Sequence, residues 1–349
     1  MKVAIITDQH FGARKNSKLF HDYFLKFYND IFFPYLEENG ITTIVDMGDT
    51  FDNRTGINFS SLAWAKDNYY DRLSNLGVRV YTVVGNHTAY YKNTNSINAV
   101  DLLLREYDNI HVVSEYEEIK LDNLKVGLIP WINAENEANT YSKLKKTKCP
   151  VVMGHLELSG FMANQNHVME HGADRNPYKK FDKVFSGHYH HRSSQDNIHY
   201  LGNPYEIYWN DVNETRGFHV FDTETLEHTP INNPYRMFYK ISYNDDNYQT
   251  FDARPYKDKI VKILVNNKGE GVKFEKFVDK LYQAGVFDLK IVESYDYDNG
   301  FVVSEDHGQD TEDTLSLLSK YIDEIETQVD KSKVKELFQT VYKEACEVE

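Results

Sequence analysis

The chain is poor in cysteine and has no long apolar run, and both shortages restrict the class of protein it can be. Its 349 residues contain two cysteines, Cys149 and Cys346, whose wide separation matches neither a zinc-ligand nor a disulfide spacing. No segment approaches the roughly 18 apolar residues of a membrane span, and the short apolar start before Asp8 is too brief for a secretory signal. We therefore expect a soluble protein of the reducing cytoplasm with no membrane partner.

Positive charge is also scarce. The net charge is −15, and residues 301–349 alone carry 13 Asp and Glu against 5 Lys. Such a chain is expected to bind long DNA weakly by itself and to depend on a partner for phosphate contacts. Arg14 and Lys15, which follow the first polar motif, are candidate phosphate contacts, whereas the basic run at 143–148 is expected to be solvated surface. The phosphate-binding pattern Gly-x-x-x-x-Gly-Lys-Ser/Thr does not occur, so any use of ATP must come from a partner.

Predicted strands and helices alternate along the first part of the chain. Strands are expected at 2–7, 41–49 and 78–87, and helical spacing of apolar residues is found between them and after them, at 17–40, 60–76 and 96–107. Further strand-like segments end at the polar residues 155 and 188. This alternation predicts a layered α/β core, with β-sheets flanked by helices.

Five polar motifs each follow an apolar, strand-like segment. In such sheets the working residues gather at the carboxyl ends of the strands, so segments far apart in sequence can form one cleft. Any single motif would be weak evidence, because Asp and Gly are common in turns. The motifs, in chain order, are TDQH (Asp8, His10), MGDTFD (Asp49, Asp52), VGNH (Asn86, His87), MGH (His155) and SGHYH (His188, His190).

These side chains predict a pair of divalent cations. Carboxylate, amide and imidazole ligands together suit Mn²⁺ or Fe²⁺ better than Mg²⁺. Two such cations can hold a bridging hydroxide and neutralise phosphoryl oxygens, which is the chemistry that phosphodiester hydrolysis requires. Because the histidines and Asn86 are neutral ligands, a small positive charge would remain to attract the substrate. We expect two Mn²⁺, with Mg²⁺ or Fe²⁺ as alternatives.

The residues themselves suggest different roles. Asp49, after the central strand, is the natural bridging carboxylate. His87 is better placed to donate a proton or stabilise charge at the leaving oxygen, with a structural histidine of the turn as the alternative. Asp52 either orients a ligating histidine from behind or is a plain turn residue.

The pattern of predicted strands and helices changes after residue 235. A strand at 259–265, a helix at 272–284 and a strand at 288–294 predict a small βαβ unit. Beyond a polar linker, apolar residues recur at alternating spacings of three and four, which predicts a helical hairpin. The expected domains are therefore a core at 1–235, a small α+β cap at 236–300, a linker at 301–310 and a helical hairpin at 311–349. The hairpin either packs on its own chain or docks helices of a partner, which the linker favours.

The motif set resembles the calcineurin-like metallophosphoesterase superfamily and, more narrowly, the SbcD-type DNA repair nucleases, including the nuclease subunits of T-even bacteriophage recombination endonucleases. The likeness covers nearly the whole chain, including the LGNPYEIYW segment after His190. It implies that Asp8, His10, Asp49 and His190 bind one metal, and that Asp49, Asn86, His155 and His188 bind the other, with His87 assisting the leaving group. The family commonly has an acidic residue after Asn-His, whereas this chain has Thr88.

The resemblance also implies activities and partners. A manganese-dependent exonuclease on duplex DNA and endonuclease on single strands is expected, acting in recombination, repair and replication. A homodimer and an SMC-like ATPase bound through the C-terminal helices are the implied partners, in the host cytoplasm if the chain is of phage origin. The alternatives are a small-molecule or protein phosphoesterase with the same dinuclear site, which the acidic charge favours, and a scaffold with a decayed site, which the complete ligand set opposes.

Overall fold

A computed structural model describes residues 1–164, 167–246, 248–265, 271–293, 331 and 333–334. The chain divides into two compact units, Met1–Tyr295 and Asp296–Glu349. The linker and the helical hairpin expected at 301–349 lie outside the described residues, apart from Lys331, Lys333 and Val334. Within the described part of the chain, no helix has the length and apolarity that crossing a membrane requires.

A six-stranded sheet carries the first three motifs. Its order is β14-β13-β1-β2-β3-β4, and β1 to β4 are parallel, while β13 runs antiparallel to β1. The central strands β1 and β2 are almost wholly buried, as expected for strands covered on both faces, whereas β4 at the edge is partly exposed. The strands are β1 (Lys2–Ile6), β2 (Thr43–Asp46), β3 (Arg79–Val83), β4 (Ile110–Val113), β13 (Arg216–Asp222) and β14 (His228–Asn233).

A second six-stranded sheet carries the other two motifs. Its order is β11-β12-β10-β7-β6-β5, with parallel central strands and antiparallel strands at both edges. Both sheets therefore present the carboxyl ends of neighbouring parallel strands. The strands are β5 (Glu117–Leu121), β6 (Leu124–Ile129), β7 (Val151–Gly154), β10 (Lys183–Ser186), β11 (Ser193–Gln195) and β12 (Ile198–Tyr200).

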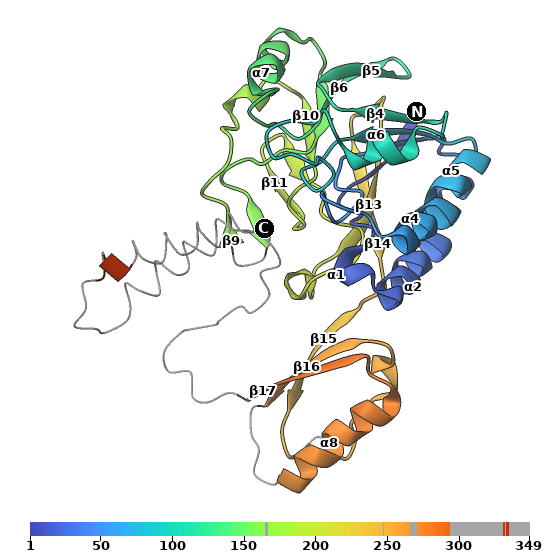
Figure 1. The fold of residues 1–349 in the computed structure, drawn as a ribbon, viewed down its shortest axis with the longest axis vertical. Helices are drawn as coiled ribbons and strands as arrows, with labels where there is room; N and C mark the ends of the chain where they lie inside the picture. Colours follow the sequence, from blue (N-terminus) through green and yellow to red (C-terminus); the bar gives the residue numbers. More distant parts are fainter. Residues whose placement is uncertain (165–166, 247, 266–270, 294–330, 332, 335–349) are drawn as a thin grey trace. The chain divides into compact units, whose positions relative to one another are not determined.

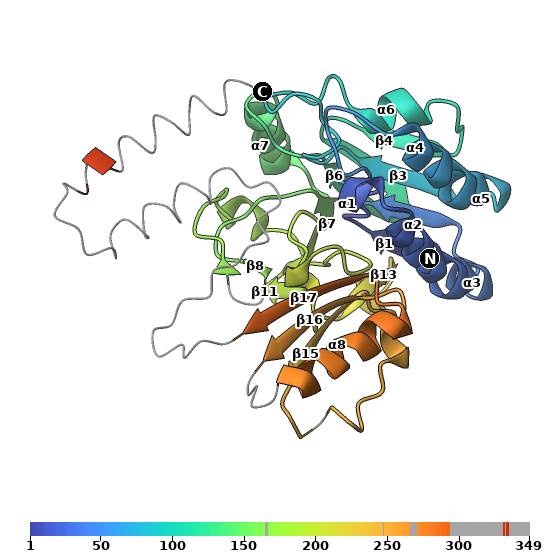
Figure 2. The same ribbon diagram turned by 60° about the horizontal axis from the view of Figure 1, so that its bottom comes forward.

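The two sheets pack face to face, and helices cover the outer face of the first sheet (Figures 1 and 2). Buried residues of both sheets, such as Val45 from β2 and Phe185 from β10, share one apolar cluster. The layered α/β core predicted from the sequence is confirmed. The core helices are α1 (Ala13–Asn16), α2 (Lys18–Phe27), α3 (Phe33–Glu38), α4 (Phe59–Ala65), α5 (Asp71–Asn75), α6 (Ala99–Leu104) and α7 (Glu137–Lys146).

Two of the predicted helices are present but are not regular. A π-helical turn at Tyr28–Phe32 joins α2 to α3, and a second at Lys66–Tyr70 joins α4 to α5. These wider turns let adjacent aromatic residues all enter the core: Phe27, Tyr28, Phe32 and Phe33 are each fully buried. The helical spacing of apolar residues describes an ideal α-helix, so it does not predict a π-helical turn.

A smaller parallel sheet follows the core. The predicted βαβ unit is present as β16 (Ile260–Val265), α8 (Gly271–Ala284) and β17 (Asp288–Glu293), and β15 (Phe238–Tyr243) adds a third strand beside β16. The buried carboxylate of Glu206 accepts the backbone N–H groups of Met237 (2.7 Å) and Phe238 (2.9 Å), which joins the core to the start of β15. A short strand pair, β8 (Met162–Asn164) and β9 (His167–Val168), lies between β7 and β10 in the sequence.

Candidate metal centre

All five motifs lie directly after strands. Asp8 follows β1, Asp49 follows β2 and Asn86 follows β3, while His155 follows β7 and His188 follows β10. The strands in each set are hydrogen-bonded parallel neighbours, so their ends meet at one edge of each sheet. Contacts between the sets close the site: the backbone N–H of His188 donates to both carboxylate oxygens of Asp8, each at 3.1 Å.

Backbone strain is concentrated at these strand ends. Four of the predicted ligands have left-handed φ angles: Asp8 (53°), His10 (46°), Asp49 (51°) and His188 (81°). Such angles cost roughly 1–3 kcal/mol for a non-glycine residue and persist only where the surroundings enforce them. Here backbone hydrogen bonds do so, because the N–H of Asp8 donates to Gly48 O and that of His10 donates to Asp49 O, both at 2.9 Å.

Two glycines allow the motifs to approach one another. A Cβ on Gly85 would lie 2.1 Å from Asp49 Oδ1, and a Cβ on Gly187 would lie 1.9 Å from Thr7 Oγ1. Both distances are far inside van der Waals contact. The glycines of the VGNH and SGHYH motifs are therefore required by close packing around the carboxylates.

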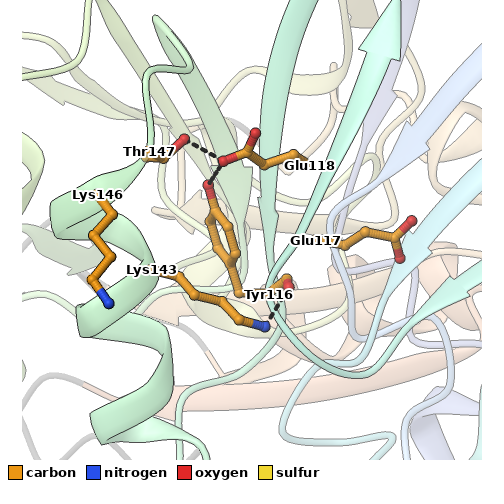
Figure 3. A pocket seen from close by; sticks show the side chains of 6 residues that line it. All are labelled: Tyr116, Glu117, Glu118, Lys143, Lys146 and Thr147. Carbon is orange, nitrogen blue, oxygen red and sulfur yellow. Dashed lines mark hydrogen bonds between the residues drawn. The ribbon is translucent and has the colours of Figure 1, made fainter.

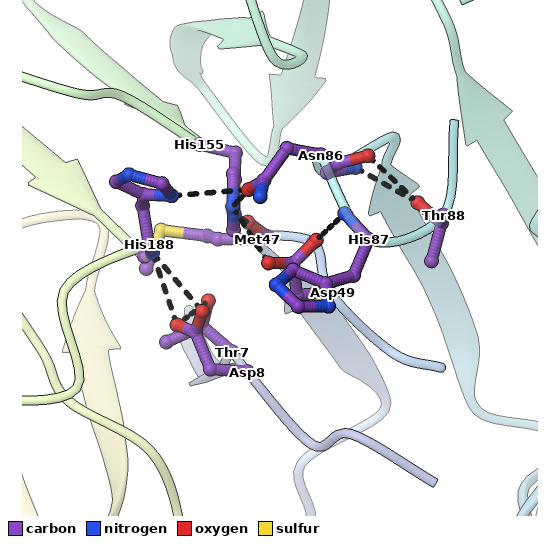
Figure 4. Close-up of polar contacts among 12 residues, drawn as sticks. Thr7, Asp8, Met47, Asp49, Asn86, His87, Thr88, His155 and His188 are labelled. Carbon is purple, nitrogen blue, oxygen red and sulfur yellow. Dashed lines mark hydrogen bonds and ion pairs between the residues drawn. The ribbon is translucent and has the colours of Figure 1, made fainter. Parts of the chain in front are cut away.

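The ligand-type atoms form three groups, and Figure 4 labels the residues of the second. In the first, atoms of Asp8, His10 and His190 lie within 4.8 Å of one another, and the two Nε2 atoms are 3.1 Å apart. In the second, atoms of Asp49, His155 and His188 meet the same limit. A third group, of His10, Asp52 and His87, shares His10 with the first.

Asn86 joins the second group. Its Oδ1 is 2.9 Å from His155 Nε2 and 3.0 Å from His188 Nδ1, and Asp49 Oδ2 is 3.1 Å from the same His155 nitrogen. Every sequence-predicted ligand is thus brought into one of two neighbouring clusters. A set of imidazoles, carboxylates and one amide oxygen at these separations fits divalent cations.

In several of these histidines, Nδ1 has a polar partner of its own. His155 Nδ1 donates to Met47 O at 2.8 Å, His10 Nδ1 lies 3.2 Å from Asp52 Oδ1, and His190 Nδ1 lies 3.4 Å from Asn203 Nδ2. Partners of this kind fix the ring orientation of metal-binding histidines. Of the two alternatives for Asp52, the geometry favours the carboxylate that orients His10 over a plain turn residue.

Burial and neighbouring charges set the protonation of the cluster. Burial opposes ionisation of Asp49, but the imidazoles of His155 and His87 outweigh it and hold its pKa well below the usual range. Burial, aided by nearby imidazoles, lowers the pKa of His188 to about 3 and that of His190 to about 4. Both histidines are therefore neutral near pH 7, which is the form that binds a cation.

The imidazole of His87 is held by a backbone carbonyl, and the residue after it is Thr88 rather than an acid. The Nδ1 of His87 donates to Asp52 O at 2.6 Å, and its backbone N–H donates to Asp49 Oδ1 at 2.8 Å. Thr88 is buried, and its hydroxyl bonds back to Gly85, accepting from the N–H and donating to the carbonyl. Thr88 therefore shapes the turn (Figure 4), while the backbone carbonyl of Asp52 holds the imidazole.

The two basic candidates are placed differently from the ligands. The Arg14 guanidinium lies over the rings of Phe20 (5.8 Å) and Phe238 (5.9 Å), and Lys15 is exposed. Both have left-handed φ angles. No contact with a predicted ligand is recorded for either among the described residues, so a phosphate contact by them stays a prediction.

Several residues that support the site were not singled out from the sequence. Arg216 is buried and lies 3.2 Å from Asp211 Oδ1, and it also donates to Glu214, Asn203 Oδ1 and the backbone carbonyl of His190. Arg54 donates to Asn86 O at 2.7 Å. Arg54 and Arg216 each contact a residue of a distant motif, so no spacing rule predicts these contacts. The only sequence signal for this part of the site was the Gly-Asn-Pro segment after β12, which contains Asn203.

The basic run on α7 is part of a separate surface pocket. Lys143 Nζ donates to Tyr116 O at 3.3 Å, and Thr147 Oγ1 donates to Glu118 Oε1 at 2.6 Å (Figure 3). The pocket is lined by Tyr116, Glu117, Glu118, Lys143, Lys146 and Thr147. It contains none of the predicted ligands, and its lysines are balanced by carboxylates.

Comparison with known proteins identifies the family of the chain. The family model for calcineurin-like phosphoesterases matches residues 1–192. Exonuclease subunit 1 of Enterobacteria phage T4 is 28% identical over 326 residues, which cover 93% of each chain.

Two solved structures show weaker likeness. An archaeal phosphodiesterase has a TM-score of 0.36 at 13% identity, over 67% of this chain and 100% of its own. The nuclease MPE of Pseudomonas putida has a TM-score of 0.30 at 15% identity, over 65% of this chain and 87% of its own. The assignment therefore rests on the family match and the phage relative. The chain belongs to the calcineurin-like phosphoesterases, a family that uses divalent metals, and is a metal-dependent phosphodiesterase.

Proposed function

We propose that this protein is a two-metal DNA nuclease. Asp8, His10, Asp49 and His190 would hold one cation, and Asp49, Asn86, His155 and His188 the other. The observation that carries this proposal is the pair of adjacent donor groups, each with ligand atoms within 4.8 Å, built from five strand ends. DNA as the substrate is supported by the similarity to a phage exonuclease subunit along 93% of both chains.

The residues would divide the chemistry between them. Bound at this centre, two Mn²⁺ ions would supply Lewis-acid stabilisation of phosphoryl charge and activation of water. Asp49 would contribute to both cation sites, since one carboxylate oxygen faces His155 and the other accepts the N–H of His87. His87, held at Nδ1 by Asp52 O, would present Nε2 as the proton donor to the leaving oxygen.

The proposed substrates and partners extend this function. We infer exonuclease action on duplex DNA and endonuclease action on single strands, in recombination, repair and replication. The partners would be an SMC-like ATPase, bound through residues 311–349, and a second copy of the chain. Sedimentation of the purified protein tests the homodimer, and a monomer across the micromolar range would reject it.

One assay separates the proposal from its alternative. Purified protein with Mn²⁺ is offered duplex DNA, single-stranded DNA, an aryl phosphodiester and a phosphomonoester. Cleavage of both DNA forms supports the nuclease. Hydrolysis of the monoester alone would reject it and favour a small-molecule or protein phosphoesterase, which the net charge of −15 makes the second candidate. Metal analysis should find two ions per chain, and a single ion would contradict the dinuclear centre.

A further inference from the structure

Gln9 lies between two of the proposed metal ligands and has no part in the chemistry assigned to them. It is fully buried, and the residues on either side of it, Asp8 and His10, both have left-handed φ angles. Because such angles persist only where the surroundings enforce them, a residue fixed between the two ligands can decide whether both reach one cation. The contacts of Gln9 therefore bear directly on the first group of ligand-type atoms.

The side-chain amide of Gln9 is held at both ends. Its Nε2 donates to Asp46 Oδ2 at 3.0 Å, and its Oε1 accepts from the hydroxyl of Tyr28 at 2.5 Å. The ionised carboxylate of Asp46 can only accept, so Nε2 must face it and Oε1 is left for Tyr28. The backbone carbonyl of Gln9 accepts from the Tyr205 hydroxyl at 2.6 Å. Three distant segments of the chain thus fix this one residue.

The carboxylate of Asp46 connects Gln9 to the second motif. Asp46 is the last residue of β2 and is buried. It also accepts from the backbone N–H of Gly48 at 3.2 Å and from the hydroxyl of Thr50 at 2.8 Å. These two residues flank Asp49, the proposed bridging ligand. A single carboxylate therefore holds the loops that carry the ligands of both motifs.

Asp46 is an expensive residue to bury at this position. Every interaction recorded for it among the described residues is a hydrogen bond or a carboxylate neighbour, and none is with a cationic side chain. Burial raises the pKa of Asp46 to about 7, although its hydrogen bonds oppose that shift. A buried carboxylate without a cation does not strengthen a core. What it supplies here is an acceptor shared by two ligand-bearing loops.

Resting on the ligand set of the proposed function, we propose that the hydrogen bond between Gln9 and Asp46 positions the ligands of the first motif for cation binding. Gln9 is then a positioning residue, which touches neither cation nor substrate. Partners that orient metal ligands in this way typically contribute about 10–100-fold to metal affinity.

The test exchanges the donor and the acceptor of this hydrogen bond. Mn²⁺ affinity of the full chain is measured by titration calorimetry for wild type, Gln9→Glu, Asp46→Asn and the double variant Q9E/D46N. Gln9→Glu sets two carboxylates against each other. Asp46→Asn introduces an amide, one end of which must face another N–H donor. Each single variant should therefore bind Mn²⁺ about 10–100-fold more weakly than wild type.

The double variant should recover. Q9E/D46N again has one carboxylate and one amide, with the polarity of the bond reversed. The new amide donates to the new carboxylate, which still accepts from Tyr28. Mn²⁺ affinity should return to within about threefold of wild type, because the two positions are coupled through this bond.

Two further variants separate positioning from stability. Leu73→Ala opens a cavity in the core that also contains Tyr28, so it should lower the unfolding temperature and keep the wild-type Mn²⁺ affinity. Gln249→Glu adds the same charge at an exposed position and should change neither.

Three results would overturn the positioning role. They are wild-type Mn²⁺ affinity in both single variants, a double variant that binds no more tightly than the weaker single variant, and a loss of affinity in Leu73→Ala equal to that in Gln9→Glu. A wild type that binds a single Mn²⁺ would overturn the dinuclear centre of the proposed function, whereas the positioning role is decided by the variants alone.

Discussion

At the scale of single residues, the predicted ligands are positioned by the protein itself. Strained backbone at Asp8, His10, Asp49 and His188 is enforced by neighbouring hydrogen bonds, and histidine rings are anchored at their second nitrogen. Such preorganisation reduces the cost of gathering ligands around a cation. The energy required is stored during folding, before any metal or substrate binds.

Asp49→Asn should remove both metals and nearly all turnover. The carboxylate contacts His155 and the His87 turn, and an amide would remove the charge that both proposed cation sites share. We expect activity to fall by at least about 10³-fold, since metal stabilisation of the transition state contributes several kcal/mol. Metal content is measured by atomic emission alongside turnover. The exposed Asp67→Asn is the control, and retention of two metals by Asp49→Asn would refute the bridging role.

His87→Ala should separate chemistry from metal binding. His87 Nδ1 donates to Asp52 O, and His87 is not one of the proposed ligands, although its imidazole forms a group with ligand-type atoms of His10 and Asp52 within 4.8 Å. Loss of a general acid typically costs about 10²–10⁴-fold in rate, so turnover should fall by that range with metal content unchanged. The deficit should shrink for an aryl phosphodiester, whose leaving group needs no proton. His171→Ala, on an exposed loop, provides the comparison; loss of metal in His87→Ala would contradict this division of roles.

The candidate site was accessible to sequence reasoning because parallel strands end together. Once Asp8, Asn86 and His188 are each assigned to a strand end, their convergence follows from the architecture. The supporting residues Arg54 and Arg216 were not accessible, because each acts on a backbone carbonyl of a distant motif. The orientation of His87 was also beyond reach, since its partner is a main-chain atom that every residue possesses.

At the scale of elements, the turn after β3 depends on a residue with no side chain. Gly85→Ala would place a Cβ 2.1 Å from Asp49 Oδ1 and 2.5 Å from its backbone nitrogen. Displacement of Asp49 should weaken metal affinity by about 10–100-fold, and overpacking should lower stability by about 1–3 kcal/mol. Metal titration and thermal unfolding measure the two effects. Gly56→Ala, where a Cβ meets nothing within 4 Å, should behave as wild type; equal behaviour of Gly85→Ala would refute the steric argument.

A cluster of histidines between the sheets should make stability pH-dependent. The ring centroids of His199 in β12 and His228 in β14 are 4.8 Å apart. Nδ1 of His228 lies 3.0 Å from Nδ1 of His219. Burial, followed by the charge of His228, lowers the pKa of His199 from 6.5 to about 4. Between these values the unfolded chain binds more protons than the folded one, so this histidine's contribution to stability falls as pH falls.

The substitution His199→Gln isolates that contribution. Relative to this variant, wild type should lose about 1–2 kcal/mol of stability between pH 6.5 and 4, less than the full pKa shift implies because the imidazole is partly exposed to solvent. Chemical unfolding at several pH values gives the difference, in which the titration of other groups cancels. A constant offset between wild type and His199→Gln across this range would mean that His199 is not held neutral by the fold.

Elements were predictable where spacing alone determines them. The strands before each motif and the βαβ unit at 260–293 follow from apolar runs and helical spacing. The π-helical turns at Tyr28–Phe32 and Lys66–Tyr70 could not be foreseen, because they arise from fitting neighbouring aromatic rings into a core formed by distant segments. The placement of β13 next to β1 is likewise set by tertiary packing.

At the scale of the whole molecule, the C-terminal segment provides a test of the proposed partnership. Deleting residues 311–349 should abolish binding to an SMC-like ATPase, because the proposed docking helices are removed, while basal DNA cleavage stays within about twofold of the full chain, since the metal ligands end at His190. Pull-down and a nuclease assay measure the two quantities. If the deletion instead left ATPase binding intact and lowered the unfolding temperature, the segment would be a stabilising part of its own chain.

The proposed metal centre is shared between two sheets, and the ligands from each sheet are made at different times. Asp8, Asp49 and Asn86 come from the first sheet, whereas His155, His188 and His190 come from the second and are translated last. A growing chain cannot assemble either cation site until residue 190 has left the ribosome and the second sheet has docked. With the proposed ligand set, the protein can cleave only after both sheets are in place, and proteolytic pieces that contain only one half should be inactive.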